Sequence, residues 1–178
     1  MPDTTFYPSS AQLPRLAKSY RRNDSGQLEV ADIFSLAGHA PTDKQRMPAA
    51  NAGLFTTAAD YGKFCRMLLG GGELDGKRIL SAKSVETMRA IVTGDLATGF
   101  TPGNGWGIGC CVVREPQGAT EALSPGSFGH GGAYGTQAWI DPIMERVYVL
   151  MTQRANFPNA DASEVRHKFQ EVASRLAR

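Results

Sequence analysis

The sequence is poor in cysteine, and none of its cysteines has the spacing of a metal or redox motif. Cys65, Cys110 and Cys111 are odd in number and include two direct neighbours, so neither a zinc knuckle nor a two-residue-spaced redox pair is expected. We expect all three to be reduced, mostly buried thiols. His39 and His167 have no partner at ligand spacing, so we expect no metal site and no cofactor.

The sequence also lacks an excess of charge of one sign and any long apolar run. Its 19 Lys and Arg residues are balanced by 17 Asp and Glu residues, which leaves a formal net charge of +2. This balance gives no reason to expect nucleic acid or an anionic membrane surface as a partner. No apolar run approaches the ~18 residues of a membrane span, and the first residues do not resemble a signal peptide. The compartment is left open between cytoplasm and periplasm.

The length and composition fit one globular domain, but the first third of the chain is short of regular patterns. The chain has 178 residues, of which 42% are hydrophobic and 20% are charged, values that are ordinary for a globular protein. Residues 1–52 show weak periodicity, apart from a short strand expected near Gln27–Ala31. Such a long stretch without secondary structure is unusual in a compact domain. We therefore expect residues 1–178 to form a single partial domain.

Helix signals become clear after Gly53. Thr57 begins a capping box that ends at Asp60, apolar residues then recur at helical spacing, and Gly70–Gly72 is expected to end the helix. The Asp75-Gly76 pair between short flanks predicts a hairpin. Ser81 is expected to cap a second helix.

The pattern changes to that of strands after Asn104. Alternating residues predict one strand over 105–113, a second over Tyr134–Ile140 and a third over Arg146–Thr152. The last segment, roughly Ala160–Ala177, is predicted to be a helix with an apolar stripe made of Val165, Phe169, Val172 and Leu176. The fold class expected is α+β, with an antiparallel sheet of about three to five strands packed by helices.

The segment Ser127–Gly135, with the sequence SFGHGGAYG, places a histidine among glycines beside one of the expected strands. A single histidine is more often structural than catalytic, so these residues alone leave both readings open. An acyl-transfer site, however, needs amide N–H groups aimed at the developing oxyanion, and glycine lets the backbone approach a substrate closely.

Three stretches together resemble the C-terminal half of the serine beta-lactamase-like family, which includes class C beta-lactamases, D-alanyl-D-alanine carboxypeptidases and related esterases. They are NAGLFTTAADYGKFCRMLLGGGELDGKRILS, GWGIGCCV and SFGHGGAYGTQAWIDP. By this resemblance, His130-Gly131-Gly132 is the third motif on the cleft wall, and Ala133 supplies an oxyanion-hole amide. Tyr134, Gly135 and Thr136 would form a strand that offers an edge to the substrate.

Two other motifs of that family do not occur in this chain. No Ser-x-x-Lys is present, since Ser81-Ala82-Lys83 has the wrong spacing, and no tyrosine begins a Tyr-x-Asn. The resemblance implies that both motifs lie upstream of the segment that Met1 resembles, so the isolated chain is expected to be inactive. A misplaced gene start, a designed truncation and a split gene remain alternative explanations.

The resemblance implies a serine hydrolase that transfers an acyl group from a small-molecule ester, amide or beta-lactam. His130 stands where many members have lysine, which favours esterase or peptidase-like members because a permanent positive charge is lost. A noncatalytic binding or assembly module and one half of a split enzyme are the alternatives. An exposed sheet edge or apolar surface also predicts a homo-oligomer.

Overall fold

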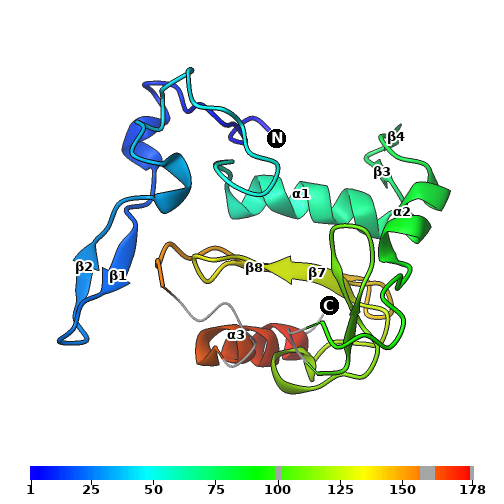
Figure 1. Cartoon of the computed structure of the whole chain (residues 1–178). Helices are drawn as coiled ribbons and strands as arrows, with labels where there is room; N and C mark the ends of the chain where they lie inside the picture. Colours follow the sequence, from blue (N-terminus) through cyan, green and yellow to red (C-terminus); the bar gives the residue numbers. More distant parts are fainter. Residues whose placement is uncertain (99–101, 157–162, 177–178) are drawn as a thin grey trace.

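The centre of the molecule is a five-stranded antiparallel sheet with helices on both faces (Figure 1). The computed structural model describes residues 1–98, 102–156 and 163–176. The strands are adjacent in sequence order: β5 (Asn104–Trp106), β6 (Cys111–Val113), β7 (Phe128–Gly131), β8 (Gln137–Asp141) and β9 (Arg146–Leu150). Helix α1 (Ala58–Leu69) covers one face and α3 (Glu164–Arg175) the other. The predicted α+β class is confirmed.

Helix α1 begins and ends where the sequence predicts. The Thr57 hydroxyl accepts a hydrogen bond from the Asp60 amide at 3.2 Å, and Gly70 is the C-cap. Two short strands follow, β3 (Glu73–Leu74) and β4 (Lys77–Arg78), joined by Asp75 and Gly76 with φ values of 50° and 73°. Ser81 caps α2 (Ala82–Arg89) by accepting from the Ser84 amide. These local predictions are confirmed. They could be made from the sequence because each cap or turn depends on neighbouring residues alone.

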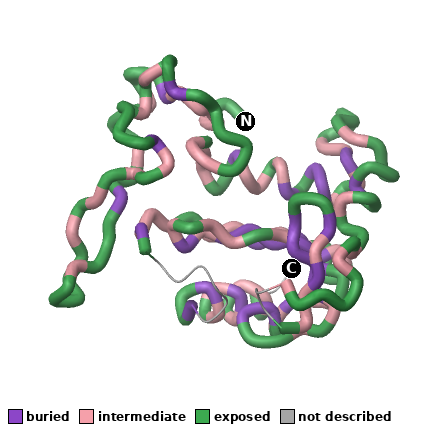
Figure 2. Tube along the Cα trace, in the orientation of Figure 1, coloured by how far each residue is buried: buried purple, intermediate pink, exposed green. Residues whose placement is uncertain are grey.

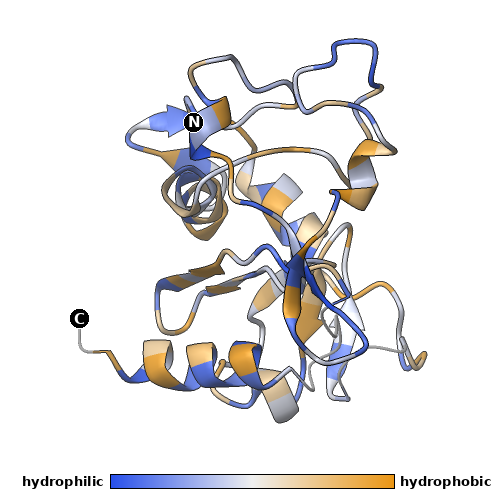
Figure 3. Cartoon of the chain, turned by 90° about the vertical axis from the view of Figure 1, so that its left-hand side faces the viewer, coloured by the Kyte–Doolittle hydropathy of each residue, from blue (hydrophilic) through white to orange (hydrophobic). Residues whose placement is uncertain are grey.

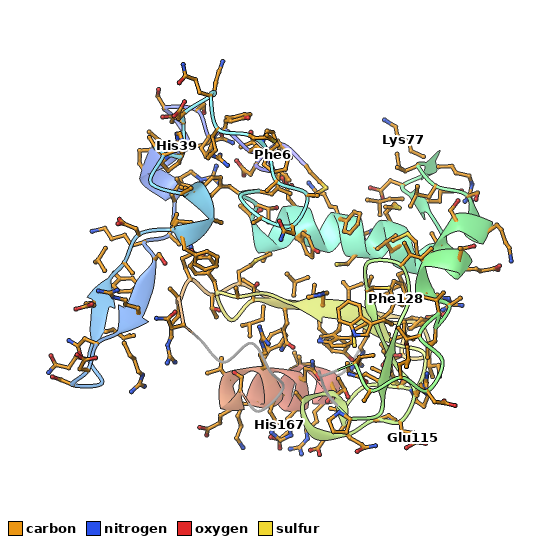
Figure 4. All side chains as sticks on the ribbon, in the orientation of Figure 1. Phe6, His39, Lys77, Glu115, Phe128 and His167 are labelled. Atoms are coloured by element: carbon orange, nitrogen blue, oxygen red, sulfur yellow. The ribbon has the colours of Figure 1, made fainter. Side chains whose placement is uncertain are left out.

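An apolar cluster joins α1 and α2 to the sheet. Cys65, Met67 and Leu68 of α1 are buried in it, and Phe128 of β7 is only 2% exposed. Figure 4 shows Phe128 between the levels of α1 and α3. A second cluster includes Trp139 and Tyr148 and lies on the α3 side, with Phe169 packed against it. The core therefore has one layer on each side of the sheet.

The face that α3 presents to the sheet differs from the predicted apolar stripe. Val165, Val172 and Leu176 are 46%, 60% and 63% exposed, and only Phe169 of the predicted stripe packs on the second cluster. Arg166 and Gln170 are buried instead. Figure 3 shows polar and apolar residues interleaved along this helix. The prediction of an apolar stripe was wrong because hydrogen-bonding partners on the sheet determine which face of α3 turns inward.

Those partners form a hydrogen-bonded network beneath the sheet. The Gln137 side chain donates to the main-chain carbonyl of Arg166 at 3.2 Å and accepts from Gln170 at 2.9 Å. It also accepts from the Trp139 indole at 3.1 Å. Buried polar groups need such partners. The network therefore fixes the position of α3 against β8.

The strand predicted over 105–113 is two strands in the structure. β5 and β6 pair through Gly105 and Val112, and the chain turns between them at 107–110. The Gly107 amide donates to the Cys110 carbonyl at 2.9 Å, while Gly109 has a φ of 74°. A side chain at Gly107 would also collide with the Met88 carbonyl. Gly107 and Gly109, which lie inside the predicted strand, are the glycines of this turn.

The first third of the chain is an exposed layer with little core of its own (Figure 2). It contains the hairpin β1 (Tyr20–Arg22) and β2 (Leu28–Val30), which confirms the short strand expected near 27–31, and two 3₁₀ turns, Leu13–Arg15 and Phe34–Leu36. Hydrogen bonds attach it to the rest. The Asp60 carboxylate accepts from the Asp3 amide at 2.8 Å, and the Tyr20 amide donates to the Gln153 carbonyl.

The turn between β8 and β9 depends on the fully buried carboxylate of Asp141. This carboxylate accepts from the amides of Ile143 at 3.0 Å and Met144 at 2.9 Å, and from that of Ser124 at 2.9 Å. We predict that Asp141→Ala lowers the free energy of unfolding by about 2–3 kcal/mol, because three amides lose a buried, charged acceptor. Urea unfolding measures this. Asp24→Ala, at an exposed turn, is the control, and an equal effect of both variants would contradict the prediction.

Candidate active site

The His-Gly-Gly segment ends strand β7 and enters a tight hairpin turn. His130 and Gly131 pair with Ala138 and Gln137 of β8. The Gly132 amide donates to the Thr136 carbonyl at 2.8 Å, and the Gly135 amide donates to the Gly132 carbonyl at 3.0 Å. Gly135 has a φ of 83°. This is the pattern of a three-residue hairpin loop that closes on a left-handed glycine.

The strand predicted to start at Tyr134 therefore starts later. Tyr134 and Gly135 lie in the turn, Thr136 follows it, and β8 begins at Gln137. The positive φ of Gly135 ends the extended conformation at that point. Consequently these three residues do not form the strand edge that the sequence predicts. A substrate contact at the turn itself stays a prediction.

The space around the glycines of the segment is limited by packing inside the molecule. A Cβ atom at Gly131 would lie 2.8 Å from Nη1 of Arg166, and one at Gly132 would collide with the Thr136 hydroxyl. At Gly129 it would collide with the Ala138 carbonyl. The sequence-based reason for these glycines was close approach of a substrate. The structure adds a second reason, which is close approach of side chains and of the neighbouring strand.

Arg166 is the residue that sequence reasoning missed. Its side chain extends from the first turn of α3 and is 2% exposed. Nη2 donates to the carbonyls of Gly132 at 2.7 Å and Thr136 at 2.9 Å. Nε donates to the carbonyl of Gly135 at 3.4 Å. The available signal was the repeat of Arg166 and Gln170 at helical spacing, which resembled an ordinary solvated face.

The amide of Ala133 is placed differently from its neighbours. Ala133 is exposed at the outer side of the turn. Within 1–98, 102–156 and 163–176, its N–H donates to no other group, whereas Gly132 and Gly135 use theirs inside the turn. An unused N–H of an exposed residue on a fixed turn can donate a hydrogen bond to an anionic oxygen.

His130 is exposed and close to an aromatic ring. Its imidazole lies edge-on to Trp106, with ring centroids 5.0 Å apart at an interplanar angle of 68°. Its Nδ1 also contacts the carbonyl of Gly131. Trp139 is buried, while Trp106 is half-buried and also borders the histidine.

A contact from the first third of the chain reaches the same turn. The rings of Tyr134 and Phe34 are stacked, with centroids 4.8 Å apart and planes inclined by 11°. The Tyr134 hydroxyl accepts from the Phe34 amide at 2.8 Å. Partial burial raises the pKa of this phenol, and the hydrogen bond from Phe34 offsets that rise only in part. Sequence reasoning had no means to pair residues a hundred positions apart.

The two other histidines and the three cysteines lie outside this turn. His39 and His167 are widely separated (Figure 4) and contact Asp43 at 2.7 Å and Glu121 at 2.8 Å, respectively. The described residues contain no group of His, Cys, Asp and Glu side chains suited to a metal ion. The three cysteines are buried thiols as predicted, and burial raises the pKa of Cys65 to about 11. Among the helices of the described ranges, none has the length and apolar character to cross a membrane.

The sheet with helices on both faces is the fold of beta-lactamase-like and penicillin-binding-protein-like hydrolases. The hydrolase EstCE1, described as having promiscuous acyltransferase activity, shares this fold with a TM-score of 0.73 at 23% identity. The match covers 97% of this chain and 46% of EstCE1. The beta-lactamase family model matches residues 1–172, and the chain belongs to that family.

Two curated relatives match most of this chain. An uncharacterized protein of Mycobacterium tuberculosis is 33% identical over 173 residues, which are 92% of this chain and 42% of the relative. A protein of Escherichia coli O157:H7 to which D-alanyl-D-alanine carboxypeptidase activity is ascribed is 27% identical over 122 residues, 68% of this chain and 27% of its own length. The chain thus spans less than half the length of each of these relatives.

The stack of Phe34 on Tyr134 yields a test of how the first third is attached. We predict that Tyr134→Leu speeds chymotrypsin cleavage after Phe34 by about two- to tenfold, because an aromatic pair contributes about 0.5–1.5 kcal/mol. Tyr134→Phe keeps the stack and is the matched control. Cleavage rates followed by mass spectrometry decide the point, and equal rates for the Tyr134→Leu variant and the wild type would refute it.

Proposed function

We propose that this chain forms one wall of the acyl-transfer site of a beta-lactamase-like serine hydrolase. The substrate class is a small-molecule ester, amide or beta-lactam. The observation that carries the proposal is the N–H of the exposed residue Ala133, directly after His130-Gly131-Gly132, which has no partner among the described residues. Membership of the beta-lactamase family supports the reaction type.

Each group has a proposed role in that site. The Ala133 N–H donates to the oxyanion of the tetrahedral intermediate, where preorganised donors have their largest effect. His130 orients the substrate from the end of β7. The 178 residues contain no Ser-x-x-Lys or Tyr-x-Asn. We therefore propose that the chain alone has no nucleophile for this reaction and requires a polypeptide segment that carries both motifs.

The first test measures hydrolysis of nitrocefin and p-nitrophenyl butyrate by the chain alone and by the chain with such a segment, joined upstream or added separately. We expect turnover only when the segment is present. Activity with a separate segment would identify a split enzyme. Ligand binding without turnover in every combination would identify a noncatalytic module and overturn the proposal. Turnover by the chain alone would show that another residue is the nucleophile.

The second test removes the proposed donor. The active form is the chain together with the segment that carries both motifs. We predict that Ala133→Pro lowers kcat of this active form by about 10²–10³-fold, the usual cost of one oxyanion-hole donor. Proline is tolerated at the second position of a turn, which Ala133 occupies. Ala133→Gly retains the N–H and is the control. If the proline variant keeps full activity, the assignment of this amide is wrong.

We also propose self-association through the exposed first third of the chain. Val30 on the edge strand β2 is 64% exposed, and nearby Leu28 is 60% exposed. Light scattering over a range of concentrations should show a dimer or larger species, and Val30→Lys should shift it toward monomer because edge charges oppose strand pairing. Val92→Lys, at a residue that is 66% exposed elsewhere, should have no effect. A monomer at high concentration would contradict the proposal.

A further inference from the structure

We propose that Arg166 is a positioning residue that fixes the direction of the Ala133 N–H, an inference that rests on the proposed function. The carbonyl of Gly132 and the N–H of Ala133 belong to one peptide unit. In a planar trans unit these two groups point in opposite directions. The Gly132 carbonyl accepts from Arg166 Nη2 at 2.7 Å on the α3 side and from the Gly135 amide at 3.0 Å within the turn, so the Ala133 N–H is directed away from α3.

The guanidinium holds both ends of the turn at once. Nη2 also donates to the Thr136 carbonyl at 2.9 Å, and Nε reaches the Gly135 carbonyl. A planar guanidinium presents several donors in a fixed geometry, whereas an ammonium group is a compact charge on a flexible stem. One rigid group therefore bridges the first and last residues of the turn, in addition to the main-chain hydrogen bond from Gly132 to Thr136.

The sequence of β7 is adapted to this guanidinium. Gly131 leaves room for it, since a Cβ atom there would lie 2.8 Å from Nη1 and 3.0 Å from Cζ. The arginine main chain is held in turn, because Gln137 donates to its carbonyl. Charged donors make shorter and stronger hydrogen bonds than neutral ones. Gly131, Gly132 and the buried Arg166 thus form one packed and hydrogen-bonded unit, and the amide of Ala133 lies at its outer side.

This arrangement predicts that the amide of Ala133 is rigid although no protein group accepts its hydrogen bond. Backbone ¹⁵N relaxation of the 178-residue chain should give Ala133 an order parameter of about 0.85, the value of a rigid backbone, although its N–H has no protein partner. In Arg166→Met the order parameter of Ala133 should fall below about 0.6, while β7 and β8 stay rigid. Arg166→Lys should give an intermediate value. Arg175→Met, on the exposed side of the same helix, is the matched control and should change nothing.

A second variant reaches the same contact from the other side. Gly131→Ala displaces the guanidinium without altering Arg166, and it should loosen Ala133 in the same way. It keeps the test decisive if Arg166→Met fails to fold. An unchanged order parameter of Ala133 in both Gly131→Ala and a folded Arg166 variant would overturn the inference.

Kinetics separate the failure of this inference from failure of the proposed function. In the active form, Arg166→Met should lower kcat by about 10–100-fold with KM nearly constant, because a misplaced donor weakens binding of the transition state alone. A loosened turn with unchanged kcat would show that Ala133 is not the oxyanion donor. A rigid turn with reduced kcat would keep the proposed function and reject the role of Arg166.

Discussion

The contact between the Arg166 guanidinium and the carbonyls of the β7–β8 turn is the constraint on which the candidate site depends. It joins α3 to the turn that follows His130-Gly131-Gly132, and it explains why glycine occupies position 131. Burying a charge is costly unless hydrogen bonds compensate for it. Main-chain oxygens of the turn contribute to this compensation, so the side chain and the turn stabilise each other.

The two faces of the sheet are consequently stabilised in different ways. Helix α1 contributes Cys65, Met67 and Leu68 to an apolar cluster, whose stability comes mainly from area removed from water. Helix α3 contributes Arg166 and Gln170, whose hydrogen bonds require definite geometry. Apolar packing tolerates small shifts more readily than a polar network does. The more demanding attachment therefore lies beneath the residues proposed to act on the substrate.

The local parts of this structure could be predicted from the sequence, while the long-range parts could not. Thr57, Asp75-Gly76 and Ser81 determine their own caps and turn through neighbouring residues. The interpretation of 105–113 as one strand failed because the glycines of that stretch turn the chain. The interpretation of α3 failed because its inward face is chosen by Gln137 and by the turn, which lie about thirty residues away.

The candidate site shows the same division. The motif His130-Gly131-Gly132 could be recognised in the sequence because its residues are adjacent. Ala133 could be assigned as well, because it directly follows the motif. Neither Arg166 beneath the turn nor Phe34 stacked on Tyr134 could be assigned to the site from its neighbours in the sequence, because each becomes relevant only through a distant partner. Membership of the beta-lactamase family supports the proposed reaction type, but the partners of the turn are visible only in three dimensions.

The proposed function depends most directly on a hydrogen bond that the Ala133 N–H donates to the oxyanion. The most direct measurement is a crystal structure of the active form inhibited by a phosphonate ester, whose tetrahedral phosphorus stands in for the reacting carbonyl carbon. The account predicts a phosphonyl oxygen at about 2.7–3.1 Å from the amide nitrogen of Ala133, with the Gly132 carbonyl still bound to Arg166. A phosphonyl oxygen bound to other donors, with Ala133 facing solvent, would contradict it.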